Sequence, residues 1–377
     1  MHKLNNNHNV YILGAGFSVD RGLPTIKDFM LTMRDAHQWL ESQGRKKEAN
    51  AIASVLDFRL DAASAAYRVK LDLENIEELF SLASASSRTL TQQIQLAIAS
   101  TLDYKLKTST EPTVNFQTAK NSIGLPKTWK HEQFDGFVEA DPFHYSCPAY
   151  EFFLTTLLGN WNNQSDFSKN SFITFNYDLL VEGALKSLSV PYTYGFDSKQ
   201  NDANVVEILK LHGSVNWAKK EKSTTNYTVH DSYEDLLKLQ QVPQLVPPTW
   251  RKIFTGPLRQ VWDRSLKSLE SATRIIVIGF SMPPTDNHFK YLMAAGLQNN
   301  ISLREIIFVN PDKNYLEQRT KELFGDSLVI GQVSNTAPIV KIISCNLASF
   351  LSQGHVPNSI GYYGRPLPNG IQNIHLR

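Results

Sequence analysis

The chain has 377 residues, of which 42% are hydrophobic and 20% are charged, and its formal net charge is +2. This composition is ordinary for a globular protein, and the length exceeds that of most single domains, so we expect two domains or one domain with a large insertion. The small net charge and the lack of a long apolar run give no case for a nucleic acid or membrane partner, and the polar N-terminus, MHKLNNNHN, lacks a secretion signal, so we expect a cytoplasmic protein.

A strand followed by a glycine turn is predicted near the N-terminus. Val10–Leu13 is an apolar run of strand length, and Gly14-Ala15-Gly16 follows it directly. Glycine permits a sharp turn and the close approach of a ligand, and a helix starting soon afterwards would direct its N–H groups at an anion such as a pyrophosphate. The alternative is an ordinary strand-to-helix turn, because the third glycine of the dinucleotide fingerprint is missing.

Residues 25–165 are predicted to form a helical insertion that covers the ligand cleft. Apolar residues recur at helical spacing through residues 26–105, and the acidic cluster around Glu77 is typical of a solvated helix face. Residues 106–145 are polar and interrupted by three prolines, which predicts irregular structure. An amphipathic helix is predicted for residues 147–161.

From residue 170 the pattern predicts a parallel sheet with intervening helices. Strand-like stretches occur at residues 171–178, 191–196 and 205–211, and residues 329–330 and 339–343 could add a last strand. Residues 275–278 and 306–309 are continuous apolar runs, typical of strands buried on both faces. Helical patterns occur at residues 178–188, 258–272, 289–297 and 315–323, and the polar stretch 219–235 is predicted to be a loop.

These elements together predict an α/β fold, a Rossmann-like parallel sheet with helices on both faces and a helical insertion after the first strand. Residues 1–24 and 166–350 are expected to form this core. Residues 351–377 are rich in glycine and proline near their start and are expected to form an extended C-terminal tail.

Three later strands end in small or functional polar residues, as the first one does. These ends are Asn176-Tyr177-Asp178, His212-Gly213-Ser214 and Gly279-Phe280-Ser281. In an open parallel sheet a ligand binds outside the carboxyl ends of the strands. The sequence therefore predicts that these stretches and the first glycine turn meet in one ligand site.

The residue types at two of these ends suit acid–base chemistry. Histidine has an ordinary pKa of about 6.5, so His212 could accept a proton at neutral pH, although a histidine at a strand end is often a structural residue. The Asn176 amide can both donate and accept hydrogen bonds, so it could orient a water or a hydroxyl group. Asp178 has the alternative role of capping the helix that follows it.

These motifs carry a family resemblance. Gly14-Ala15-Gly16-Phe17-Ser18, Thr174–Asp178, His212-Gly213-Ser214 and Gly279-Phe280-Ser281 stand in the order found in sirtuins. Over residues 10–22 and 170–310 the chain resembles most closely the bacterial sirtuin-like proteins that hydrolyse NAD in antiphage defence.

The resemblance implies that NAD is the substrate and that nicotinamide and ADP-ribose are the products. It implies catalytic roles for His212, Asn176 and Asp178. The implied contacts to the dinucleotide come from Gly14, Ala15, Gly16, Ser18, Gly279, Ser281 and Asn310. For Asn310 the alternative is turn formation in the sequence Asn-Pro-Asp. Pro24–Phe29 agrees only in part with the NAD-contacting run of deacylating sirtuins, so Asp20, Arg21 and Asp28 are candidates only. For Asp28 the alternative is a charge on a helix face.

The chain also departs from the sirtuin pattern. Its two cysteines, Cys147 and Cys345, cannot form the four-cysteine zinc module of protein-deacylating sirtuins, so no metal is expected. Phe175 stands where sirtuins have a glutamine, which makes an acyl-lysine tunnel less favoured.

The resemblance further implies an NAD-depleting effector held in a homo-oligomer or regulated by a partner, such as a HerA-type ATPase, an Argonaute-like protein or a phage component. Two other functions stay open. One is an NAD-dependent protein deacylase or ADP-ribosyltransferase, and the other is a non-catalytic module that senses NAD or ADP-ribose.

Overall fold

An eight-stranded parallel sheet forms the centre of the protein. The computed structural model describes residues 8–86, 88–118, 138–141, 144–158, 167–196, 204–220, 226–249, 256–282, 287–324, 329–330, 339–345 and 371–376. The sheet has the order β14-β15-β13-β12-β1-β5-β7-β6, and its neighbouring strands pair in parallel. The strands are β1 (Asn9–Leu13), β5 (Asn170–Thr174), β6 (Tyr192–Thr193), β7 (Val206–Lys210), β12 (Arg274–Ile278), β13 (Glu305–Val309), β14 (Val329–Ile330) and β15 (Ile339–Ile343).

Strand β1 is the central strand and marks the point at which the strand order reverses. The chain adds β5, β7 and β6 on one side of β1 and then returns to add β12, β13, β15 and β14 on the other. All five residues of β1 are buried, because β5 and β12 pair with its two edges and helices cover the sheet. Such a reversal is where open α/β sheets bind ligands, at the carboxyl ends of the strands.

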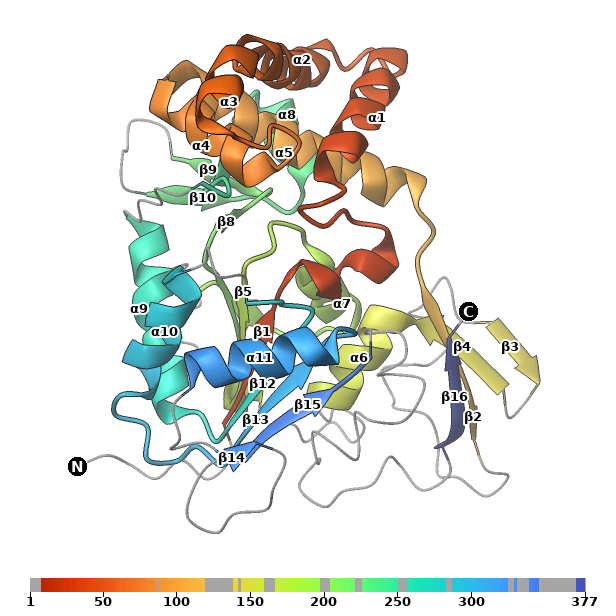
Figure 1. Ribbon diagram of the computed structural model, residues 1–377. Helices are drawn as coiled ribbons and strands as arrows, with labels where there is room; N and C mark the ends of the chain where they lie inside the picture. Colours follow the sequence, from red (N-terminus) through yellow and green to blue (C-terminus); the bar gives the residue numbers. More distant parts are fainter. Residues whose placement is uncertain are drawn as a thin grey trace.

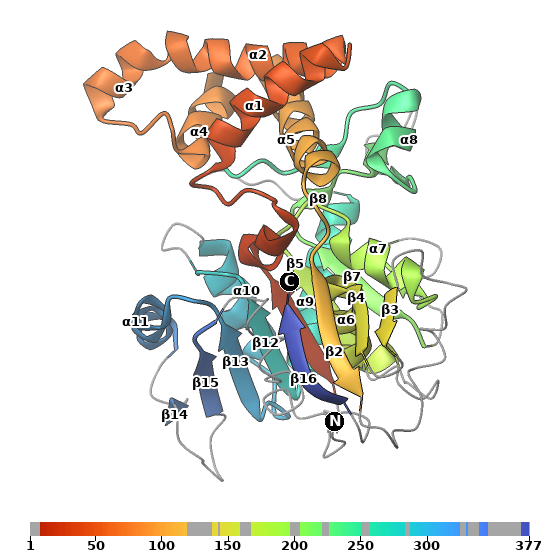
Figure 2. The same ribbon diagram turned by 90° about the vertical axis from the view of Figure 1, so that its right-hand side faces the viewer.

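Helices cover both faces of the sheet, as predicted. Helices α6 (Ala149–Leu158) and α7 (Leu180–Ser187) lie on one face, and α9 (Pro257–Ser271) and α10 (Asn287–Leu297) lie on the other (Figures 1 and 2). Helix α11 (Lys313–Leu323) packs beside β15. The predicted α/β Rossmann-like fold is thereby confirmed. Among the described residues no helix has the length and apolar character needed to cross a bilayer.

A separate helical layer lies beyond the carboxyl ends of the strands (Figure 1). It contains α1 (Phe29–Ser42), α2 (Lys46–Asp61), α3 (Ala63–Val69), α4 (Ile76–Ser86) and α5 (Arg88–Thr108). The layer has its own core, distinct from that of the sheet, and this core also includes Val215, Tyr233 and Leu245 from the later part of the chain. Tyr233 begins α8 (Tyr233–Lys238). The predicted insertion therefore forms most of the layer but not all of it.

Residues 113–148 contain strands where irregular structure was predicted. Strands β2 (Thr113–Thr118), β3 (Val138–Asp141) and β4 (His144–Pro148) form an antiparallel sheet with β16 (Ile371–Leu376), in the order β16-β2-β4-β3. Proline limits helices but is compatible with the ends of short strands. Helix α6, which follows this sheet, packs into the core of the parallel sheet. The predicted insertion of residues 25–165 thus contributes α1–α5 to the helical layer and α6 to the layer that covers the parallel sheet.

The stretch predicted as a loop at residues 219–235 also contains regular structure. Strands β9 (Trp217–Lys219) and β10 (Tyr227–Val229) pair in antiparallel fashion, and α8 follows them. Two further short strands, β8 (Gly213–Ser214) and β11 (Gln244–Leu245), pair next to the end of β7. Three-residue 3₁₀ helices lie at Ala15–Phe17 (η1), Val19–Arg21 (η2) and Phe167–Lys169 (η4).

Candidate functional site

The two glycine turns that follow β1 and β12 pack directly against each other. The Gly16 N–H donates to the Gly279 carbonyl oxygen at 2.8 Å. A Cβ atom on Gly14 would lie 2.6 Å from that same oxygen, and a Cβ atom on Gly279 would lie 2.2 Å from the Phe17 nitrogen. Gly279 also has φ of +63°, which disfavours any side chain. These glycines are therefore required for contact between the turns, in addition to any approach by a ligand.

The helix expected soon after the first glycine turn is a short 3₁₀ helix and not an α-helix. The chain forms the three-residue helices η1 and η2 instead, and the first long helix of the chain, α1, begins only at Phe29. The N–H groups of Phe17 and Ser18 donate to the carbonyl oxygens of Gly14 and Ala15 at 3.0 Å. These are the internal bonds of the short helix, so they do not test the expected contact of its N-terminus with a pyrophosphate, which stays a prediction.

A chain of hydrogen bonds joins the turn after β1 to the loop after β5. The Asn176 Nδ2 donates to Ser18 Oγ at 3.1 Å, and Ser18 Oγ donates to Asp178 Oδ2 at 2.8 Å. Ser18 and Asp178 are buried. We call this chain, Asn176–Ser18–Asp178, the relay. It gives Ser18, predicted to contact the dinucleotide, a role in holding Asn176 in place.

The relay fixes the orientation of the Asn176 amide. Its Nδ2 also donates to the Gly14 carbonyl oxygen at 2.9 Å, and a carbonyl oxygen can only accept, so the donor must be the NH₂ group. The Oδ1 atom is therefore the acceptor that Asn176 can offer to a water or a hydroxyl group.

Asp178 has both carboxylate oxygens engaged. Oδ2 accepts from Ser18, and Oδ1 accepts from the Leu180 backbone N–H at 3.1 Å. The second bond ties the carboxylate to the first residue of α7 in an Asx turn, and the N-cap of this helix is Leu179, not Asp178 as the alternative interpretation predicted. Asp178 can thus order the site through the relay whether or not it also contacts a ligand.

His212 lies at the end of β7, next to the strand that carries Asn176. It is 6% exposed, and its ring meets the Phe175 ring edge-on at a centroid distance of 5.2 Å. Phe175 in turn stacks on Phe280 at 4.7 Å, with the two ring planes 8° apart. Behind the histidine, Gly213 has φ of +81°, and a Cβ atom there would lie 2.1 Å from the Gln244 carbonyl oxygen. The imidazole therefore stands against an apolar wall and a closely packed backbone.

One cavity brings most of the predicted site residues together. It has a volume of about 170 Å³ and lies at the carboxyl ends of β1, β5, β7 and β12. Its lining includes the following predicted residues: Ala15, Ser18, Asn176, Asp178, His212, Gly279 and Ser281. The helical layer closes it with Phe29, Ile76, Glu77 and Leu102. Of these four residues, only Phe29 belongs to a stretch, Pro24–Phe29, that the sequence analysis connected with the site.

Glu77 corrects an expectation about the acidic cluster. It was expected on a solvated helix face, but it is half-buried and lines the cavity near the start of α4. Its neighbour Glu74 does face solvent, where it pairs with Arg34 at 3.0 Å. Helical spacing alone could not show which of these carboxylates faces the cavity. Helix α4 packs against α5 on one side and borders the cavity on another, so it has two buried sides.

Other predicted residues lie outside the cavity lining. Gly14 and Gly16 support the turn from behind. Asn310 follows β13, and its Oδ1 accepts from the Asp312 N–H at 3.0 Å, which is the turn alternative. Its contact with a dinucleotide stays a prediction. Arg21 donates to the Leu106 and Ser109 carbonyl oxygens at 2.8 and 2.7 Å, so its guanidinium caps the end of α5.

The remaining candidates have local explanations. The Asp28 Oδ2 accepts from Thr25 Oγ1 at 2.8 Å, at the start of α1 and on the surface. Burial raises the pKa of the Cys345 thiol to about 11, as expected for a structural cysteine. The Cys147 side chain lies outside the described residues. Within the described part of the chain, no group of three His, Cys, Asp or Glu side chains could hold a metal ion.

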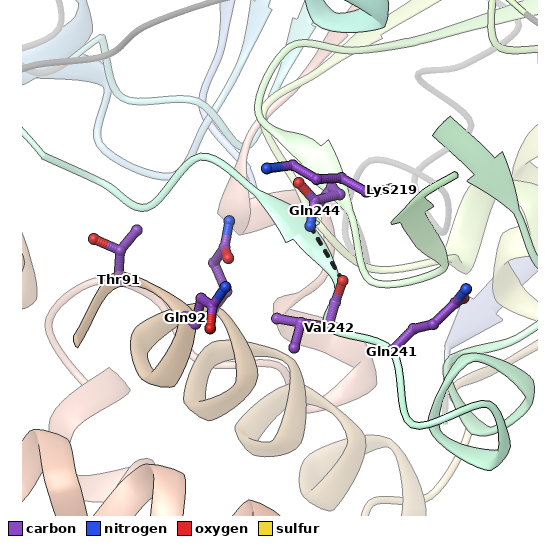
Figure 3. Close-up of a pocket in the computed structure, with 7 residues that line it drawn as sticks. Thr91, Gln92, Lys219, Gln241, Val242 and Gln244 are labelled. Carbon is purple, nitrogen blue, oxygen red and sulfur yellow. Dashed lines mark hydrogen bonds between the residues drawn. The ribbon is translucent and has the colours of Figure 1, made fainter. Parts of the chain in front are cut away.

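A second hollow, of about 450 Å³, lies between α5 and the segment that precedes β11 (Figure 3). Its lining residues are Thr91, Gln92, Gln95, Lys219, Gln241, Val242 and Gln244, of which only Lys219 is titratable. Acid–base catalysis needs a group that changes protonation near neutral pH. The smaller cavity, with a histidine and two carboxylates, is therefore the better candidate for a catalytic site.

Sequence comparison identifies the segment that carries Asn176, Asp178 and His212. Residues 170–327 match the SIR2-like domain. This SIR2-like segment begins with β5 and includes α11, and it supplies the cavity residues of three strand ends. No curated protein matches the chain.

The chain is also similar to solved Sir2 structures. A Sir2 homologue mutant in complex with ADP-ribose aligns with a TM-score of 0.41 and 15% identity, over 95% of this chain and 96% of that chain. Sir2Tm bound to a propionylated peptide gives 0.37 and 12%, over 95% of each chain. Sir2 with an inhibitor, 2'-O-acetyl-ADP-ribose and a deacetylated peptide gives 0.37 and 12%, over 94% of each chain.

Proposed function

We propose that the protein hydrolyses NAD to nicotinamide and ADP-ribose and acts as an NAD-depleting effector of bacterial antiphage defence. One observation carries the proposal: Asn176, Asp178 and His212 of the SIR2-like segment line a single cavity at the carboxyl ends of the strands. The defence role, a homo-oligomer, a cytoplasmic location and a HerA-type ATPase or other defence partner are proposed from the sirtuin-like motifs.

The proposed reaction breaks the bond between the nicotinamide nitrogen and the ribose carbon and adds water to that carbon. By analogy with glycoside cleavage, the ribose passes through an oxocarbenium-like state. Nicotinamide leaves with the bonding electron pair, and the attacking water loses one proton. The His212 imidazole is the group in the cavity suited to accept that proton. The Oδ1 of Asn176 is suited to orient the water or a ribose hydroxyl, because the relay already holds its NH₂ group.

The apolar side of the cavity suits the nicotinamide ring. Phe175 and Phe280 are 8% and 9% exposed and form a stacked pair that lines the cavity. Flat rings pack favourably on such aromatic surfaces, and exclusion of water strengthens the polar contacts nearby. Phe175, which departs from the sirtuin pattern, therefore has a physical role in the proposed site.

The size of the cavity suits a resting state. A volume of about 170 Å³ is below the roughly 300–1,000 Å³ usual for ligand sites. A whole dinucleotide would fit inside this cavity alone only if the cavity widened. Phe29, Ile76 and Leu102 of the helical layer form the side that faces the strand ends. We infer that a change in the position of this layer, set by a partner or by assembly, activates the enzyme.

Nicotinamide release from NAD by the purified full-length protein tests the proposal. The protein is assayed alone and with the proteins that co-purify with it, and equal amounts of nicotinamide and ADP-ribose are expected. Tight NAD or ADP-ribose binding without release in either sample would favour the sensing module. Acyl or ADP-ribosyl transfer on an acetyl-lysine peptide or a protein substrate would favour the transferase.

Two substitutions test the assignment of roles. His212→Ala and Asn176→Ala are each expected to lower turnover about a hundredfold or more, because they remove a proton acceptor and a positioning amide. His37→Ala, which removes an imidazole on α1 that does not line the cavity, is the matched control and should keep full activity. Near-normal turnover by His212→Ala with a native melting temperature would rule out its proposed role.

A further inference from the structure

Lys210 is a buried cation two residues before His212. It lies on β7 and is 1% exposed. Removing an ammonium group from water is costly unless a carboxylate and further acceptors surround it. Its Nζ lies 2.9 Å from Glu182 Oε1 on α7, and it also donates to the main-chain carbonyl oxygen of Asp178. Lys210 therefore joins three elements: β7, α7 and the loop after β5.

The carboxylate that holds Lys210 is itself ordered by buried side chains. Glu182 is 3% exposed, and its Oε1 accepts from Tyr194 Oη at 3.1 Å. Tyr194 Oη in turn accepts from Asn216 Nδ2 at 3.3 Å. Burial and the nearby Glu182 raise the pKa of Tyr194 well above its ordinary value, so the phenol stays protonated and can donate. The acceptor for Lys210 thus has a fixed place.

The bond from Lys210 reaches the residue that ends the relay. The side chain of Asp178 holds Ser18, and Ser18 holds Asn176, while the main chain of Asp178 accepts from Lys210. The same strand that carries Lys210 leads directly into His212. A single side chain thereby connects the backbone of the relay to the strand that carries the imidazole.

We propose that Lys210 is a positioning residue that sets Asn176 relative to His212 through the main chain at Asp178. A buried ion pair is weak support for stability, since apolar residues of similar size often replace one without loss. The ion pair of Lys210 and Glu182 instead has a role in ordering the site, because Lys210 also binds the main chain at Asp178. The effect on turnover rests on the proposed NAD hydrolysis, whereas the effect on the loop does not.

The test compares the single variant Lys210→Met with the double variant Lys210→Met/Glu182→Leu. The single variant leaves a buried carboxylate without its cation and is expected to melt at a lower temperature. The double variant removes both charges and is expected to regain part of that loss, although the Tyr194 hydroxyl group then lacks its Glu182 acceptor. Hydrogen exchange at residues 176–180 is expected to be at least tenfold faster in the double variant, because the tie to Asp178 is missing.

For NAD turnover, the double variant is expected to lose at least tenfold in kcat while KM changes less than threefold. Lys210→Arg, which keeps a buried cation, should have a higher kcat than Lys210→Met. Lys341→Met is the matched control. Lys341 on β15 pairs with Glu305 on β13 at 2.8 Å, neither residue lines the cavity, and kcat should not change. Native exchange at residues 176–180 in a folded double variant would overturn the proposal, as would native kcat. A wild-type protein that releases no nicotinamide would refute the proposed function, and the exchange measurement would still test the positioning role.

Discussion

Ser18 shows how one small side chain can order a site through its hydrogen bonds to neighbouring side chains. Its hydroxyl group accepts from Asn176 and donates to Asp178, and it is 2% exposed. A hydroxyl group is suited to this place because it has one proton to give and lone pairs to receive. The direction of both bonds follows from the Gly14 carbonyl oxygen, which can only accept: it turns the Asn176 NH₂ group toward Ser18, so the Ser18 proton is left for Asp178. The relay therefore has one arrangement, and that arrangement leaves Asn176 Oδ1 to act on a water or hydroxyl group.

Glu151 on α6 is a second residue whose burial has a measurable consequence. It is 7% exposed, its Oε2 has no hydrogen-bond partner among the described residues, and burial raises its pKa to about 7. Between the ordinary glutamate pKa of 4.5 and about 7 the folded state holds a proton that the unfolded state releases, so stability falls as pH rises through this window. Above pH 7 the loss is complete, at about 3 kcal/mol.

Glu151→Gln is therefore expected to raise the free energy of unfolding at pH 8 and to change it little at pH 5. Chemical denaturation of both proteins at the two pH values measures this difference. Glu317→Gln, on the surface of α11, is the control and should show no such dependence. A difference between Glu151→Gln and wild type that is equal at pH 5 and pH 8 would contradict the role of burial.

At the scale of elements, the contact between the two glycine turns determines how closely the carboxyl ends of β1 and β12 approach each other at the cavity. Gly279→Ala would place a Cβ atom 2.2 Å from the Phe17 nitrogen, at φ of +63°. Main-chain atoms on both sides cannot yield as a side chain can. We expect a loss of more than about 2 kcal/mol in the free energy of unfolding.

Gly183→Ala is the matched control for this substitution. Gly183 lies inside α7, is exposed, and has no atom within 4 Å of the position of a Cβ atom. Alanine is a better helix former than glycine, so this change should raise stability by up to about 1 kcal/mol. Thermal or urea unfolding of both variants gives the answer, and a similar effect of both substitutions would count against the turn contact.

At the scale of the whole molecule, the helical layer and the sheet are joined by more than the chain connection. Tyr233 of α8 lies in the core of the layer, and its Oη is 3.1 Å from Glu48 Oε1 of α2 and 3.0 Å from Ser100 Oγ of α5. Glu48 is held in turn by Arg45. Burial and Glu48 raise the pKa of Tyr233 well above its ordinary value, so the phenol remains a donor. Tyr233 belongs to the SIR2-like segment, so this segment contributes to the helical layer that covers the cavity.

Tyr233→Phe is expected to lower the free energy of unfolding by about 1–3 kcal/mol, because buried acceptors lose their donor. It should also speed hydrogen exchange in α8. Tyr67→Phe is the control: Tyr67 on α3 is 93% exposed, and loss of its hydroxyl group should have no effect. Equal stability of the two variants would show that the layer does not depend on this contact.

The sequence by itself determined the parts of this protein that depend on local burial. The buried strands are rich in apolar residues, and the parallel sheet with its site at the carboxyl ends follows from their order. Asn176, Asp178 and His212 were predicted to meet, and they line one cavity. The strands of residues 113–148 were missed because the polar, proline-containing stretch lacks a clear period.

The tertiary structure alone decided which partners each side chain meets. The glycine turns pack on each other, Glu77 faces the cavity, and Lys210 bonds to the main chain of Asp178. Ser18 and Asp178 are 160 positions apart in the chain. Periodicity and composition record whether a residue is buried, but a contact between such distant segments depends on how the whole chain folds. That is why the sequence could place the residues at the site but not say what each one holds.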